Sequence, residues 1–207
     1  MDRIFYNPWV GKKYEDGIGG KKILVLGESH HCTDACHNCG ITTISHNCNS
    51  FTTTIILKYL KYKENRQSFE RWMNTFTRFA NISLGKKLNK HEQIDFWESV
   101  SFYNYVQKAV FEARLSPTRN DFNNSLNAFH DLIENLKPDL IILWGHRLWH
   151  NLPKEQYFTS DENTLNLKIS YYKKDNLKIP IKIIHHPSSS TFSYSHSKEI
   201  KEFINGI

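Results

Sequence analysis

Short apolar runs separated by polar segments are the main pattern along this chain. Runs at residues 23–26 (ILVL), 139–144 (DLIILW) and 179–184 (IPIKII) are bounded by Gly, Pro or charged residues. Short runs rich in β-branched residues with such boundaries predict buried strands, as in a parallel sheet. Residues 100–106 predict a further strand, and the polar segment 159–176 predicts an edge strand followed by a turn.

Helical spacing fills the intervals between these strands. Apolar residues recur at steps of three and four in segments 50–62, 67–79 and 121–136, and shorter helices are expected at 92–98 and 195–204. Strands that alternate with helices predict an α/β fold, a three-layer α/β/α sandwich with a mostly parallel central sheet. We find no internal repeat, so we expect a single domain over residues 1–207.

The composition agrees with a globular protein. The chain has 207 residues, enough for one domain with a proper core, and its 39% hydrophobic content argues against disorder. It has neither a secretory signal nor the ~20 consecutive apolar residues that a membrane helix needs. We therefore expect a cytoplasmic protein without membrane contact, and a monomer. The net charge of +6 fits either a lysine-rich proteome or a polyanionic partner.

Two of the predicted strands end in loops of polar, titratable residues. Residues 23–26 run into Gly27, Glu28, Ser29, His30 and His31, and residues 179–184 run into HHPSSS at 185–190. Ligands of open α/β sheets bind outside the carboxyl ends of the strands. The two loops therefore predict one shared site, which favours an enzyme.

The order of the strand-end motifs resembles that of the uracil-DNA glycosylase superfamily. The motifs are LVLGESHH at residues 24–31, FYNYV at 102–106, LWG at 143–145 and HPS at 186–188. They follow each other in the family order, and the resemblance covers the chain from about Tyr6 to the end. It implies a glycosylase-like fold and a monofunctional DNA glycosylase, which hydrolyses the N-glycosidic bond of a flipped-out damaged or modified base.

The resemblance also implies roles for individual residues. His186 matches the donor that stabilises the departing base, Asn104 matches the amide that reads the base, and Gly27 is a further base-binding candidate. The alternatives are that His186 only bonds the backbone and that Asn104 only caps a turn. The small residues of the last motif would approach a DNA phosphate: Pro187, Ser188, Ser189 and Ser190.

The first motif departs from the family pattern. Ser29 stands where many members have a water-positioning Asp or Asn, and His30 and His31 replace the familiar proline and its neighbour. We expect Glu28, the only carboxylate in the motif, to position the attacking water, with His30 as an alternative base. The alternative is that Glu28 only caps the following turn. These changes leave open which base is excised, and whether the chain is instead an inactive member that binds DNA, a nucleotide or a protein partner.

All four cysteines lie within one Cys/His-rich loop, residues 30–48. In a cytoplasmic protein, such clustering favours a metal over disulfides. We expect one structural Zn²⁺, with an iron–sulfur cluster or no metal as alternatives, and we expect the chemistry to need no cofactor. The candidate ligands are Cys32, Cys36, Cys39 and Cys48.

Three further residues are candidates for the rim of the site. Trp9, in an aromatic turn before the first strand, lines either the base pocket or the edge of the core. Arg114 is a candidate for phosphate contact, whereas Arg119 fits a solvated loop better. A basic helix start after residue 145 is also consistent with DNA binding.

Overall fold

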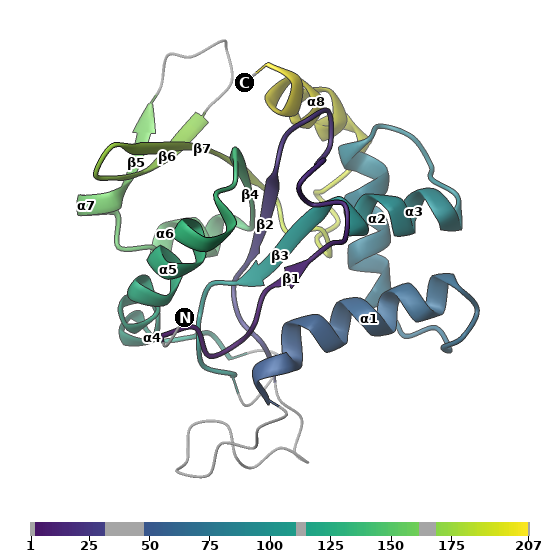
Figure 1. Cartoon of the computed structure of the whole chain (residues 1–207), viewed down its shortest axis with the longest axis horizontal. Coiled ribbons are helices and arrows are strands. Elements are labelled where there is room, and N and C mark those ends of the chain that lie inside the picture. The colour runs from purple at the N-terminus through teal and green to yellow at the C-terminus, as the bar shows by residue number, and fades with distance from the viewer. Residues whose placement is uncertain (1–2, 32–47, 111–114, 162–168, 207) are drawn as a thin grey trace.

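The computed structural model describes residues 3–31, 48–110, 115–161 and 169–206. They form an α/β fold with a seven-stranded mixed sheet in the order β1-β3-β2-β4-β7-β6-β5 (Figure 1). The strands are β1 (Trp9–Val10), β2 (Ile23–Gly27), β3 (Val100–Asn104), β4 (Leu140–Trp144), β5 (Phe158–Asp161), β6 (Ile169–Lys174) and β7 (Leu177–Ile184).

The centre of the sheet is parallel and both of its edges are antiparallel. The pairings of β2 with β3, β2 with β4 and β4 with β7 are parallel. By contrast, β1 pairs antiparallel with β3, and β5, β6 and β7 form an antiparallel series. Only Asp175 and Asn176 connect β6 to β7, and Asp175 has a left-handed φ of 53°. So short a connection can join only antiparallel strands, because a parallel pair needs a long crossover. The sheet is thus less parallel than the sequence pattern predicted.

Helices flank both faces of the sheet (Figure 1). One group is α1 (Phe51–Lys63), α2 (Met73–Ser83), α3 (Lys90–Glu98) and α8 (Ser197–Asn205). The other is α4 (Arg119–Asn124), α5 (Leu126–Leu136), α6 (His146–Asn151) and α7 (Lys154–Tyr157). Successive side chains of β2 point to opposite faces of the sheet. Ile23 and Val25 therefore join one core cluster, and Leu24 and Leu26 join the other. None of the helices in the described part of the chain is long and apolar enough to span a bilayer.

Polar side chains set several helix boundaries. The predicted helix 121–136 is two helices, because the chain bends at Ser125, whose hydroxyl donates to the Asp121 carbonyl and accepts from the Gln107 N–H. Such local bonds compete with helix continuation. The predicted helix 67–79 begins later, at Met73, and runs on to Ser83.

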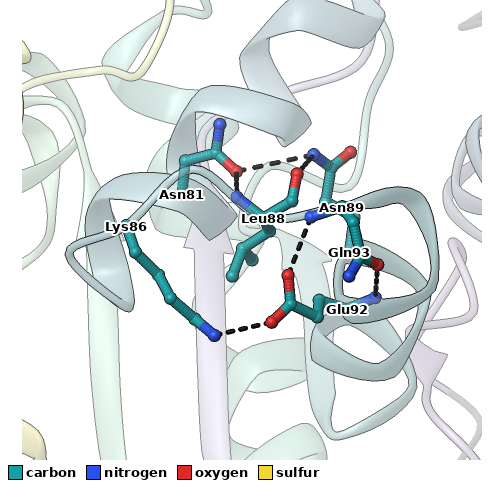
Figure 2. Close-up of polar contacts among 6 residues, drawn as sticks. All are labelled: Asn81, Lys86, Leu88, Asn89, Glu92 and Gln93. Carbon is teal, nitrogen blue, oxygen red and sulfur yellow. Dashed lines mark hydrogen bonds and ion pairs between the residues drawn. The ribbon is translucent and has the colours of Figure 1, made fainter.

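The basic connector between α2 and α3 is fixed by the network in Figure 2. The Asn89 side chain accepts from the Glu92 N–H, and Glu92 accepts in return from the Asn89 N–H, which makes a capping box. Lys86 donates to the other Glu92 oxygen at 2.6 Å, and Asn81 accepts from the Leu88 N–H at 3.1 Å. This network anchors the start of α3, whose chain leads directly into β3 and the site.

Candidate functional site

A cleft of about 760 Å³ opens at the carboxyl ends of the parallel strands. Its walls come from the ends of β2, β3 and β4, the start of α6, the segment after β7, and side chains of α1 and α2. The sheet register explains the convergence, because Gly27 lies beside Asn104, and Trp144 beside Ile184. Seven of the predicted site residues line this cleft: Gly27, Glu28, Ser29, His30, Asn104, His186 and Ser189.

Gly27 and Asn104 are packed tightly at the floor of the cleft. A Cβ atom at Gly27 would lie only 2.1 Å from Oδ1 of Asn104 and 3.2 Å from Cζ of Phe102. The two strand ends stay together beyond this pair, since the Tyr105 N–H donates to the Gly27 carbonyl at 2.9 Å. Only glycine at position 27 therefore lets the Asn104 amide lie against the backbone of β2.

His30 lies next to Asn104 in the lining of the cleft and is almost completely buried, with 4% of its surface exposed. Nδ2 of Asn104 lies 3.1 Å from Nδ1 and 3.4 Å from Nε2 of His30, and the Thr52 hydroxyl lies 2.9 Å from Nε2 of His30. Burial lowers the pKa of His30 to about 3, with a smaller contribution from His31. Burial and these close neighbours suit a neutral histidine that packs against Asn104 better than a base or a metal ligand.

Glu28 projects into the cleft mouth and is held by Arg147 at the start of α6. Nε of Arg147 donates to one Glu28 oxygen at 2.8 Å, and Nη2 donates to the other. The Glu28 side chain is only 10% exposed, whereas that of Arg147 is 55% exposed. Nη1 of Arg147 also donates to the Ser116 hydroxyl at 2.9 Å. The bidentate pair fixes a carboxylate in the cleft and places a guanidinium at its edge.

Ser29 contributes less than its neighbours. Its Oγ is buried and has no hydrogen-bond partner among the described residues. It therefore has no base beside it that would activate its hydroxyl. Within the first motif, the charged group available to a ligand is the Glu28 carboxylate.

His186 stands on the opposite side of the cleft, after β7. Its Nδ1 accepts from the Ser188 N–H at 3.2 Å and lies 2.7 Å from the Ser188 hydroxyl. Because Nδ1 accepts a bond, the neutral ring carries its proton on Nε2, which makes Nε2 a donor. Desolvation lowers the pKa of His186; the Glu28 carboxylate raises it, and Arg147 lowers it. The lowered pKa favours the neutral ring.

Aromatic rings form one wall of the cleft. Phe102 and Trp144 have their ring centroids 5.1 Å apart, and Phe76 of α2 lies 5.7 Å from Phe102. The Trp144 ring also meets His186 edge to face at 5.8 Å. Flat apolar surfaces of this kind suit a planar ligand, which stacks on aromatic faces.

The segment after His186 forms a compact turn. Pro187 is buried, Ser188 and Ser190 are exposed, and the Ser189 N–H donates to the His186 carbonyl at 2.8 Å. A second turn, between β4 and α6, contains Gly145, whose φ of +94° a glycine adopts without strain. Gly145 and Ser189 both line the cleft.

Trp9 does not line this cleft, and several predicted residues fall outside the part of the chain that the structure describes. Trp9 lies in the core, where its indole Nε1 donates to the Trp97 carbonyl at 2.8 Å, so the core alternative fits its position and the base-pocket role does not. Arg114, Cys32, Cys36 and Cys39 lie outside the described residues. Cys48 is half-buried at the start of the short helix η1 (Cys48–Ser50). Within the described ranges, no three His, Cys, Asp or Glu side chains are arranged to hold a metal ion.

Sequence reasoning missed two of the contacts that organise the site. Thr52 gives no signal in the sequence, since it is one of three threonines in the first turn of α1. The sequence identified Arg147 only as part of a basic helix start. It did not predict the pairing with Glu28, because the two residues are 119 positions apart. Phe76 of α2 packs in the core and also lines the cleft.

Comparison with known proteins adds no assignment. No protein-family model matches the chain, and no curated protein matches its sequence.

Proposed function

We propose that the cleft receives a flipped-out nucleobase of DNA and that the protein hydrolyses its N-glycosidic bond, as a divergent member of the uracil-DNA glycosylase superfamily. One observation carries the proposal: an amide, a carboxylate and an imidazole donor, from Asn104, Glu28 and His186, line one cleft at the carboxyl edge of the parallel strands. The three-layer glycosylase-like fold is part of the same proposal.

Each group matches one demand of the reaction. The bond between the sugar C1′ and the base nitrogen breaks, and its electron pair leaves with the base. Nε2–H of His186 donates to the base oxygen on which negative charge develops. Water then forms a bond to C1′ and loses a proton, which the departed base anion takes up. The products are a free base and an abasic sugar.

Glu28 acts mainly through its charge in this scheme. A carboxylate near C1′ offsets the positive charge that builds on the sugar, and it orients the water. Arg147 occupies one lone pair on each Glu28 oxygen, and the remaining lone pairs are left for the water. Since the sugar cation needs little help from a strong nucleophile, orientation and charge are sufficient.

The surroundings of the cleft suit DNA. A volume of about 760 Å³ lies within the range of roughly 300–1,000 Å³ that is typical of ligand pockets. The exposed Ser188 and Ser190 would approach a phosphate, and the exposed guanidinium of Arg147 lies at the same rim. The net charge of +6 favours a polyanion.

A second candidate is a base-binding protein that does not cleave. It is favoured by the pairing of Arg147 with both Glu28 oxygens, because a carboxylate held in this way has less capacity to bind water. The base would then be held by Asn104 and the aromatic wall without hydrolysis.

Duplex and single-stranded oligonucleotides, each with one modified base at a defined position, separate the two candidates. The enzyme should convert one or more of them to an abasic site, which alkali cleaves, and His186→Ala should lose about 10²-fold in single-turnover rate while it keeps its DNA affinity. His91→Ala is the matched control, because it removes an exposed imidazole from α3 outside the cleft. Tight binding without abasic sites across the panel would favour the non-cleaving protein.

A further inference from the structure

A second pocket lies apart from the cleft and has a volume of about 430 Å³. Its walls come from α4, the start of α5, the end of α6, and α7. None of the described residues lines both this pocket and the cleft. The volume falls within the range of roughly 300–1,000 Å³ that is typical of ligand pockets, and the proposed function gives this pocket no role.

Side chains that can carry positive charge gather in this pocket. Arg119 at the start of α4, His150 in α6 and Lys154 at the start of α7 all line it. Among the lining side chains that the structure describes, none is acidic. Asp121, the carboxylate of α4, instead bonds the cap of its own helix and pairs with Lys108 at 3.5 Å. The cations of the pocket thus have no counterion within its described lining.

The donors of these side chains are available to a ligand. Arg119 and His150 are exposed, and neither side chain has a hydrogen bond or an ion pair with another described residue. The Lys154 ammonium lies 5.0 Å from the centroid of the Trp149 ring, a cation–π contact that leaves its charge in place. Unpaired cations in a hollow of the surface attract an anion and concentrate it there.

Neutral donors and apolar groups complete the lining. The side-chain amides of Asn123 and Gln156 are exposed, and neither is hydrogen-bonded to another described residue. Tyr157 is half-buried, and its ring packs edge to face on His130, with the centroids 4.5 Å apart. Leu126 adds apolar surface. The pocket therefore offers both a group of hydrogen-bond donors and a place for the organic part of a ligand.

A phosphate ester matches this lining better than a simple carboxylate. A phosphate group carries about two negative charges and three acceptor oxygens, so it can accept from donors on several helices at once. A guanidinium binds phosphate through two parallel N–H bonds, and an ammonium adds a point charge. A carboxylate has fewer oxygens and less charge, so it would leave more of these donors without a partner.

We propose that this pocket is a second binding site, and that its ligand is a phosphate ester whose phosphate is held by Arg119, His150 and Lys154. Such a group occurs in a free nucleotide and in the backbone of DNA. Helix α6 connects the two hollows, since Arg147 lines the cleft and His150, three residues later, lines the pocket. The inference does not rest on the proposed function, because the pocket and the cleft share no described residue.

Arg119→Gln tests the site, because it removes one charge from an exposed and unpaired side chain and should leave the fold intact. Arg66→Gln is the matched control, because it removes the same charge from the turn after α1, outside the pocket. The probes are inorganic phosphate, adenosine 5′-monophosphate and an unmodified single-stranded oligonucleotide of thymidines, each titrated into the full chain. The side-chain NH₂ resonances of Asn123 and Gln156 report occupancy of the pocket, and calorimetry measures the dissociation constant.

We expect at least one probe to bind saturably and to shift both amide resonances. Arg119→Gln should weaken this binding by about tenfold or more, the scale for one charge-assisted hydrogen bond, and Arg66→Gln should leave it unchanged. Binding of phosphate or of the mononucleotide assigns a free ligand, and binding of the oligonucleotide alone assigns the DNA backbone; both results support the site. The site is refuted if no probe shifts the two resonances, or if Arg119→Gln weakens binding no more than Arg66→Gln does. Because the test measures binding alone, a failure to release any base would leave its outcome unchanged.

Discussion

Replacement of Gly27 by alanine tests the geometry of the cleft floor. The new Cβ would lie 2.1 Å from Oδ1 of Asn104, so the amide must move by more than an ångström and give up its 3.1 Å contact with His30. Overpacking in a well-filled site costs about 1–3 kcal/mol, and a lost buried hydrogen bond adds about 1 kcal/mol. We expect the free energy of unfolding to fall by about 2–4 kcal/mol.

A double-mutant cycle isolates this contact. Asn104→Ala removes the atom that Gly27→Ala would strike, and the remaining neighbour, Cζ of Phe102 at 3.2 Å, needs only a small shift. In the Asn104→Ala background, Gly27→Ala should therefore cost less than about 1 kcal/mol, a coupling of roughly 2 kcal/mol. Urea unfolding followed by tryptophan fluorescence measures all four proteins. An equal cost of Gly27→Ala in both backgrounds would refute the packing argument.

Three further predictions address the chemistry. Glu28→Gln should sharply reduce the rate of base release while the fold and the DNA affinity are retained. Ser29→Ala should change that rate little, because Oγ of Ser29 has no partner among the described residues. An inactive Ser29→Ala variant beside an active Glu28→Gln variant would reverse these roles. His186 should titrate below the ordinary histidine pKa of 6.5 in an NMR titration, because desolvation disfavours the charged ring, and Glu28→Gln should lower the midpoint further by removing a carboxylate that raises it. A midpoint at or above 6.5 would contradict this. Protein purified without chelator should contain about one zinc per chain, and Cys39→Ser should lose metal content and thermal stability together; no metal, or the brown colour of an iron–sulfur cluster, would exclude zinc.

The parts of the fold that were predictable from the sequence are those with local causes. The central strands end where their apolar runs meet Gly27 and Gly145, and parallel pairing brings those ends to one edge. Most helices follow from their spacing. The break at Ser125 was missed because it depends on a hydroxyl that bonds both its own turn and Gln107.

The contacts that refine the site were not predictable, because they join distant segments. Arg147 reaches Glu28 across 119 positions, and Thr52 at the start of α1 reaches His30 in the segment after β2. Trp9 could not be placed from its aromatic neighbours, since an aromatic turn suits a pocket and a core edge equally well. Long-range packing decided in favour of the core.

The most direct test of the proposed function makes no assumption about the base. Mixed genomic and phage DNA is incubated with the protein, and mass spectrometry identifies any free base while an aldehyde-reactive probe counts abasic sites in the same sample. The account predicts one or a few free bases that accumulate in step with abasic sites, and a rate lowered about 10²-fold by His186→Ala. DNA that binds the protein and yields neither free base nor abasic sites would contradict it.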